Sequence, residues 1–157
     1  MSSWLEGKTA IVIGERDGVQ GPSIAKCLEA AGANIVYAVT ECFVWTAAGT
    51  MDPANQEQIK KIAENIGEGN TDDIIVVLGA GDIEGALISA ETVTIGDPSF
   101  SGPLAGVSLG LPVYHILEPM MREAIPEDVY DEEVGIVAMT EDVDAIGKEF
   151  EGIRNQK

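Results

Sequence analysis

Cys42 is the residue of this chain best placed to carry out covalent chemistry. Cys42 comes three residues after the end of an apolar run, Ile35–Val39, that is typical of a buried β-strand. It therefore comes at the carboxyl end of a predicted strand, the edge at which parallel α/β sheets bind their ligands. A thiol in such a loop can be shifted towards the reactive thiolate, whereas many other free cysteines are only small buried hydrophobes. We take Cys42 as a candidate catalytic residue.

Position 45, three residues after Cys42, is where a redox motif would have its second reactive residue. A redox pair of the Cys-x-x-Cys type would have a second sulfur or selenium there, but this chain has Trp45. A tryptophan by itself is typical of a partly buried anchoring side chain. Glu41, beside Cys42, would oppose ionisation of the thiol if its carboxylate lay close, unless it points away. The spacing indicates a redox pair from which one chalcogen is missing.

The other residues that could do chemistry have simpler interpretations. Cys27 falls on the apolar face of a predicted helix, so we expect it in the core. His115 is the single histidine and lies late in a predicted strand, where a hydrogen-bonded core histidine is more common than a catalytic base. The acidic segment Glu127–Glu133 lacks the spacing of a metal-binding loop and is expected to be solvated surface. We predict no metal site.

The elements that must position Cys42 alternate between strand and helix. Apolar runs predict four strands and a short fifth; helical spacing and capping residues predict the helices between them. The strands are Thr9–Ile13, Ile35–Val39, Ile74–Leu78, Thr92–Ile95 and Leu111–Leu117. The helices run from Pro22 to Gly32, Ile59–Ile66, from Asp82 to Ala90, Leu104–Leu109 and Val143–Ile153, with 130–140 ambiguous. This order predicts an α/β fold: one domain over residues 1–157, with a mainly parallel sheet covered by helices on both faces, in a Rossmann- or flavodoxin-like three-layer arrangement.

Composition narrows the classes of partner. The 157 residues are 45% hydrophobic and carry 9 basic against 27 acidic side chains, a net charge of −18. Such a surface repels phosphate backbones and anionic lipids, so we expect neither nucleic acid nor membrane as a partner. The N-terminus lacks the basic and apolar regions of a signal peptide, and there are only two cysteines. We therefore expect a cytoplasmic protein.

The glycine-rich loop after the first predicted strand offers an alternative function. Residues Gly14–Gly21 lie where a Rossmann- or flavodoxin-like module binds a nucleotide. However, the glycines follow a G-x3-G-x2-G pattern rather than G-x-G-x-x-G, and two acidic residues inside the loop oppose a phosphate. A structural turn is the simpler interpretation, and a nucleotide-binding module remains the alternative prediction.

Several sequence blocks carry a resemblance to a known family. They include Ile13–Gly18, Thr40–Val44 followed by Thr46–Gly49, Ala90–Val93, Gly96–Pro98, Gly102–Val107 and Val129–Glu132. With these blocks the chain resembles the selenoprotein A family, the small component A shared by glycine, sarcosine and betaine reductase complexes, roughly from Glu6 to Arg154. The family's active motif is Cys-x-x-selenocysteine. Cys42 matches the cysteine, and Trp45 occupies the selenocysteine position.

The resemblance implies a redox carrier with two catalytic positions, Cys42 and Trp45. In the family the selenol accepts a carboxymethyl group from component B, and component C converts the two-carbon unit to acetyl phosphate. Thioredoxin then reduces the selenide–sulfide bond that remains. No other cofactor is implied. Selenocysteine is encoded by UGA, which some codes read as Trp, so we expect Trp45 to mark a selenocysteine site, and the chain as written to be inactive. A non-catalytic relative in which a genuine Trp45 anchors a partner is the remaining alternative.

Overall fold

The computed structural model describes residues 3–42, 49–66 and 73–155. Within these ranges the chain forms a four-stranded parallel sheet in the order β2-β1-β3-β4. The strands are β1 (Thr9–Glu15), β2 (Asn34–Glu41), β3 (Ile74–Leu78) and β4 (Val113–His115). The α/β prediction with a parallel sheet is confirmed, and the order places β1 and β3 in the centre.

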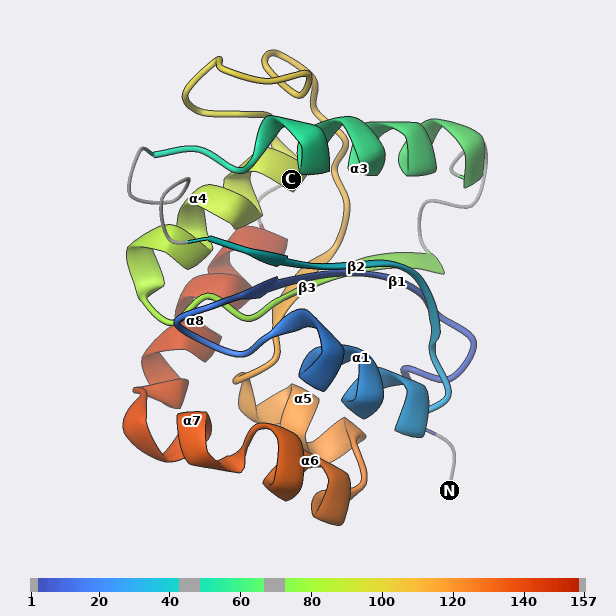
Figure 1. Cartoon of the computed structure of the whole chain (residues 1–157), viewed down its shortest axis with the longest axis vertical. Coiled ribbons are helices and arrows are strands. Elements are labelled where there is room, and N and C mark those ends of the chain that lie inside the picture. The colour runs from blue at the N-terminus through green and yellow to red at the C-terminus, as the bar shows by residue number, and fades with distance from the viewer. Residues whose placement is uncertain (1–2, 43–48, 67–72, 156–157) are drawn as a thin grey trace.

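The helices cover both faces of this sheet. Figure 1 shows α3 (Pro53–Ile66) and α4 (Ile83–Thr94) on one side, with α1 (Gly21–Ala30), α5 (Pro119–Ala124) and α6 (Glu127–Glu133) on the other. A short helix, α7 (Gly135–Thr140), follows α6, and α8 (Val143–Arg154) packs on β4 and α4. This is the three-layer arrangement that the alternating pattern predicts.

Local chemistry explains where several helices begin. The Asp82 carboxylate accepts a hydrogen bond from the Gly85 amide at 2.6 Å, which caps α4 as expected. Asp52 does the same before α3, accepting from the Ala54 amide at 2.9 Å. Proline lies in the first turn of α1, and Gly32, with a φ of 95°, follows its end. These caps fix the ends of the segments that lead to and from the sheet.

Burial distinguishes the central strand β3 from the edge strand β2. Every residue of β3 is buried, as its uninterrupted apolar run predicts. In β2, by contrast, exposed and partly buried residues alternate up to the buried Glu41. The prediction of a buried strand is wrong for β2, because this strand forms an edge with one face exposed and the other only partly covered.

Other predicted boundaries also need correction. Residues 92–94 are the last turn of α4, so no short strand forms there, and residues 104–109 form turns and an extended segment rather than a helix. The fourth strand is limited to residues 113–115. Residues 130–140, which were ambiguous, belong to α6 and α7. Helix α4 continues to Thr94 because the helical spacing of apolar residues continues past Ala90. No helix forms at 104–109 because glycines at 102, 106 and 110 disfavour one.

Candidate functional site

Cys42 directly follows the last residue of β2 and is exposed. It therefore lies at the carboxyl edge of the parallel sheet, where the sequence predicts it. The chain returns to the described structure at Gly49 and enters α3 at Pro53. Trp45, the second predicted catalytic position, lies outside the described residues. An exposed thiol at this edge is accessible to a large reaction partner.

A buried carboxyl group underlies the strand end. Glu41 accepts hydrogen bonds from Asn55 Nδ2 at 3.1 Å and, at a longer 3.4 Å, from the Asp52 amide. The Asn55 Oδ1 in turn accepts from the Tyr37 hydroxyl at 2.6 Å. Burial raises the pKa of Glu41 to about 7, with further increases from the charges of Asp52 and Glu15, although its hydrogen bonds lower the pKa. The Glu41 carboxyl group thus faces the beginning of α3.

A second buried polar group connects the return segment to a distant turn. Gln56, fully buried on α3, donates to the Met51 carbonyl at 2.8 Å and to Asp97 Oδ2 at 3.3 Å. Its Oε1 accepts from the Leu104 amide at 3.2 Å. Residues 97–104 are therefore attached directly to the segment that follows the Cys42 loop.

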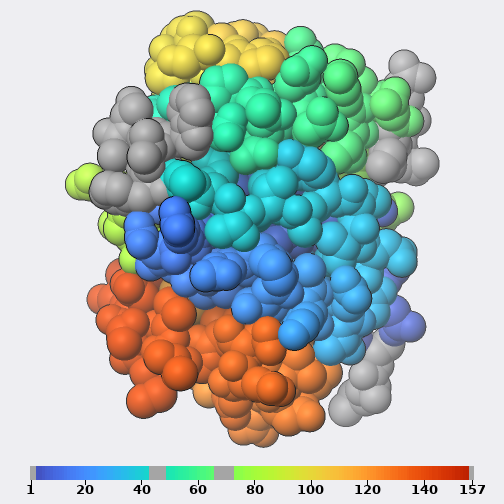
Figure 2. Space-filling model, viewed as in Figure 1, coloured from blue at the N-terminus to red at the C-terminus, as the bar shows by residue number. Residues whose placement is uncertain are grey.

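Asp97 organises that turn from within. Its carboxylate accepts from the backbone amides of Ser99, Ser101 and Gly102 and from the Ser99 hydroxyl, at 2.7–2.9 Å. Burial alone would raise its pKa, but these hydrogen bonds outweigh burial and leave the pKa below its ordinary value. Phe100, at the exposed tip, has a φ of 54°, the one positive value outside glycine among the described residues. The space-filling view shows this yellow segment at one end of the molecule, with α6 and α7 in orange at the opposite end (Figure 2).

The glycine-rich loop after β1 is used for close packing. A Cβ at Gly14 would lie 2.1 Å from the Gly21 amide nitrogen, and one at Gly18 would lie 2.1 Å from the Gly79 carbonyl oxygen. The Val19 amide also donates to that Gly79 carbonyl at 2.8 Å. The loops after β1 and β3 thus contact each other between the two central strands. These contacts require the glycines without any phosphate ligand, and the alternative of a nucleotide module gains no support from them.

The two other candidate residues belong to the core. Cys27 is fully buried, and burial together with the charge of Glu133 raises its pKa to about 12. His115 is also fully buried: Nε2 lies 2.8 Å from the Ala80 carbonyl oxygen, and Nδ1 accepts from the Leu117 amide at 3.1 Å. Burial lowers its pKa to about 4, so the ring is neutral near pH 7. The expectations for Cys27 and His115 are confirmed.

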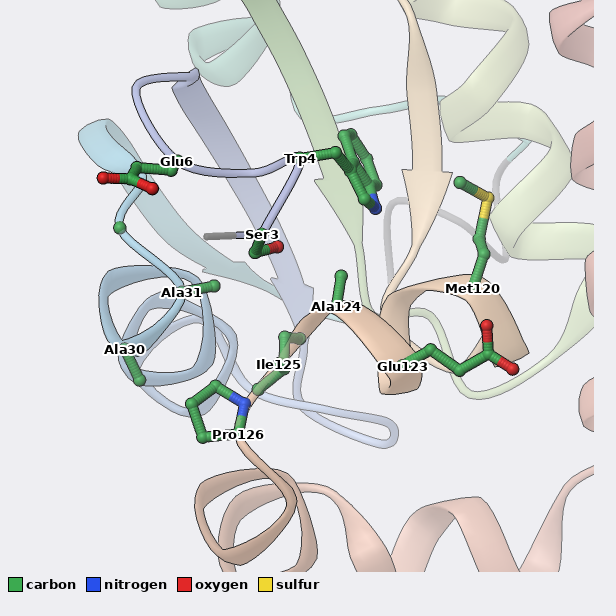
Figure 3. A pocket seen from close by; sticks show the side chains of 11 residues that line it. Ser3, Trp4, Glu6, Ala30, Ala31, Met120, Glu123, Ala124, Ile125 and Pro126 are labelled. Carbon is green, nitrogen blue, oxygen red and sulfur yellow. The ribbon is translucent and has the colours of Figure 1, made fainter. Parts of the chain in front are cut away.

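Figure 3 shows a pocket of about 820 Å³, and Cys42 is not among the residues that line it. It is lined by the N-terminal segment, the end of α1 and residues 120–126. Glu6 and Gly32, which line it, precede β1 and β2, so the pocket is near the amino ends of these strands. Its position gives it no role in chemistry at the carboxyl edge.

The acidic segment is largely surface, as expected. It forms α6, in which Tyr130 is buried and the Asp131 carboxylate pairs with Arg122 at 3.2 Å. Within residues 3–42, 49–66 and 73–155, no group of three His, Cys, Asp or Glu side chains is arranged to hold a metal ion. In the same ranges no helix has the length and apolar character needed to cross a membrane.

Comparison with known proteins identifies the family. The family model described as "Glycine reductase complex selenoprotein A" matches residues 5–154, nearly the whole chain. The chain belongs to this family. A component A of the glycine/sarcosine/betaine reductase complex from Carboxydothermus hydrogenoformans is 54% identical, covering 97% of this chain and 96% of the relative. Component A1 from Peptoclostridium acidaminophilum is 50% identical, with 98% and 96% covered. No solved structure matches the chain.

Membership in the selenoprotein A family confirms the resemblance drawn from the motif blocks. Spacing alone did not connect the polar residues around the end of β2. Tyr37 lies on β2, Asn55 and Gln56 lie on α3, and Asp97 lies in a distant turn, so they come from three separate segments. One signal was present in the sequence: Asn55 and Gln56 are polar and follow the capping Asp52. Only the fold shows that Asn55 faces the strand end and that Gln56 faces the turn at Asp97.

Proposed function

We propose that this chain is the carrier component of a glycine, sarcosine or betaine reductase and that its reactive group resides at position 45 and Cys42. The observation that supports this most directly is an exposed Cys42 at the carboxyl edge of the sheet, in a chain of the selenoprotein A family. Its relatives are named as components of a reductase complex, so partner components are part of the proposal.

In the proposed reaction the native protein has selenocysteine at position 45. The selenolate attacks the methylene carbon of a carboxymethyl group held through nitrogen on component B, a carbon–selenium bond forms and the carbon–nitrogen bond breaks. The nitrogen takes up protons and stays on component B until water hydrolyses the bond that holds it there, which releases ammonia or a methylated amine. Selenium is polarizable and ionised at neutral pH, which suits it to this displacement.

The second half of the reaction uses Cys42. Component C takes the two-carbon unit as an acetyl thioester on a thiol of its own. The carbon–selenium bond breaks, one carboxyl oxygen leaves as water, and a selenium–sulfur bond to Cys42 forms, so that the carrier loses the two electrons that the acetyl unit gains. Phosphate then releases acetyl phosphate. Thioredoxin returns two electrons and two protons, restoring the selenol and the thiol.

An indole at position 45 can neither displace the amine nor bond to sulfur. We therefore expect the Trp45 chain to fold and to give no acetyl phosphate with components B and C, whereas Trp45→selenocysteine restores its formation. Cys42→Ser in the selenocysteine form is the matched control, which we expect to load the carboxymethyl group once and not to be recycled. Turnover by the Trp45 chain would overturn the assignment of the nucleophile.

Peptide mass spectrometry of protein from its native host tests the status of position 45 directly. A selenium isotope pattern in the peptide containing Cys42 supports the carrier proposal. An indole mass at position 45 contradicts it and favours the non-catalytic relative in which Trp45 anchors a partner.

A further inference from the structure

The buried Glu41 carboxyl group connects the two ends of the Cys42 loop. Glu41 is the last residue of β2, immediately before Cys42. Its two hydrogen-bond donors, the Asp52 amide and Asn55 Nδ2, lie 11 and 14 residues further on, where the chain has returned and entered α3. One side chain therefore bridges the segment that leaves the sheet and the segment that comes back.

Further hydrogen bonds hold this bridge in place. The Tyr37 hydroxyl, from β2 itself, donates to Asn55 Oδ1 at 2.6 Å and so directs the amide nitrogen of Asn55 towards Glu41. The Arg16 amide donates to the Glu41 carbonyl at 3.0 Å, which fixes the backbone of Glu41 to the chain leaving β1. The position of the carboxyl group is thus determined from three segments.

The charged groups facing Glu41 are acidic. Glu15 is its register partner on β1 and is also buried, and Asp52 lies at the beginning of α3. Residues paired across adjacent parallel strands place their side chains on the same face, about 5 Å apart at the backbone. The uncharged Asn55 of α3 and Tyr37 of β2 complete the surroundings. Burial is the main cause that raises the pKa of Glu41, and the charges of Asp52 and Glu15 raise it further, which brings the titration of Glu41 into the neutral range.

We propose that Glu41 is a positioning residue whose protonation state sets how firmly the end of β2 is attached to the start of α3, and thereby the reactivity of Cys42. The hydrogen bonds favour the ionised carboxylate, but burial disfavours it more, so ionisation weakens the attachment of the strand end to α3. Ionisation also adds a negative charge beside Glu15 and Asp52, which repel it. Both effects loosen the strand end and make Cys42 more accessible to an electrophile. The inference deepens the proposed function, on which its relevance to the reductase rests.

The test is the pH profile of Cys42 alkylation by iodoacetamide in the Trp45 chain, with products located by peptide mass spectrometry. Because Cys27 is buried, the fast reaction reports Cys42. After correction for thiolate content, we expect the wild-type rate constant to rise about two- to tenfold as pH rises through 7, because ionisation of Glu41 loosens the strand end. In Glu41→Gln, which is uncharged and of the same size, we expect the remaining rate constant to be independent of pH.

Glu118→Gln is the matched control, because Glu118 is equally buried but pairs with Arg154 far from Cys42 in the sequence. We expect this control to lower thermal stability and to keep the wild-type inflection. If the wild type has no inflection near pH 7, or Glu41→Gln retains it, the proposal is overturned. The assay needs neither selenium nor partner components, so failure of the reductase reconstitution leaves this result standing, and failure here leaves the carrier proposal standing.

Discussion

The two cysteines differ in environment, as the sequence predicts. Cys42 is exposed at a strand end, whereas Cys27 lies in the core with a pKa raised by burial to about 12. A thiolate is needed for alkylation, so a buried, protonated thiol reacts slowly. Alkylation of the native protein therefore reports the reactivity of Cys42 and not that of Cys27.

We predict that brief treatment with iodoacetamide at pH 8 modifies one cysteine in the native protein, and that this cysteine is Cys42. Cys27 should react only after unfolding in urea. Peptide mass spectrometry with and without urea measures both, and Cys42→Ser serves as the control that removes the native reaction. Rapid modification of Cys27 without urea would show that the first helix is not packed as described.

Two buried titratable residues give opposite contributions to stability. His115 has a folded-state pKa lowered to about 4, so its contribution is lost as pH falls from about 6.5 to 4. Glu41 has a folded-state pKa raised to about 7, so its contribution is present at low pH and is lost as pH rises from about 4.5 to 7. Each effect amounts to a few kcal/mol at most, by about 1.4 kcal/mol per pH unit.

We therefore predict a wild-type free energy of unfolding that changes little between pH 4.5 and 6.5, because the two contributions oppose each other. Glu41→Gln should remove one of them and leave stability that decreases clearly on acidification. Urea unfolding at several pH values measures this. A variant whose stability is as flat with pH as the wild type would contradict the assignment.

At the scale of elements, the two glycine loops after β1 and β3 form the tightest junction. Gly18 lies against the backbone of residues 79–81, so an added methyl group there has no space. Backbone atoms cannot rotate away as a flexible side chain can, so the loops themselves would have to separate. The junction lies between the central strands, where displacement also disturbs the sheet.

We predict that Gly18→Ala lowers the free energy of unfolding by about 3 kcal/mol or more. Gly152→Ala is the matched control: Gly152 lies in α8 with open space around its Cα, and alanine should stabilise this helix by about 0.5–1 kcal/mol. Chemical denaturation of both variants is the measurement. Equal effects of the two substitutions would argue against the close approach of the loops.

At the scale of the whole molecule, Arg154 attaches the C-terminal helix to the edge of the sheet. Its guanidinium pairs with the buried Glu118 carboxylate through two bonds of 2.7 and 2.8 Å, and Nη1 also donates to the Val113 carbonyl. The same group lies 4.4 Å from the centre of the Tyr114 ring. α8, β4 and the beginning of α5 are held together at this point.

Arg154→Ala should cost about 3–5 kcal/mol, because it leaves a buried carboxylate without its cation. Lys61→Ala is the control, since Lys61 forms an exposed pair with Glu57 and should cost less than about 0.5 kcal/mol. Thermal unfolding compares the two. A similar change in melting temperature for both variants would indicate that the buried pair does not anchor α8.

The sequence by itself determined the alternation of strands and helices, the place of Cys42 at a strand end, the core positions of Cys27 and His115, and the resemblance to the selenoprotein A family. These features depend on periodicity, capping residues and motifs, all of which are formed by residues close together in the sequence. Only the tertiary structure decided that β2 is an edge strand, that residues 92–94 remain helical and that Glu41, Asn55 and Tyr37 meet. The physical reason is that strand order, burial and contacts between distant side chains arise from packing between elements. The spacing of residues within one element does not predict how that element packs against the others.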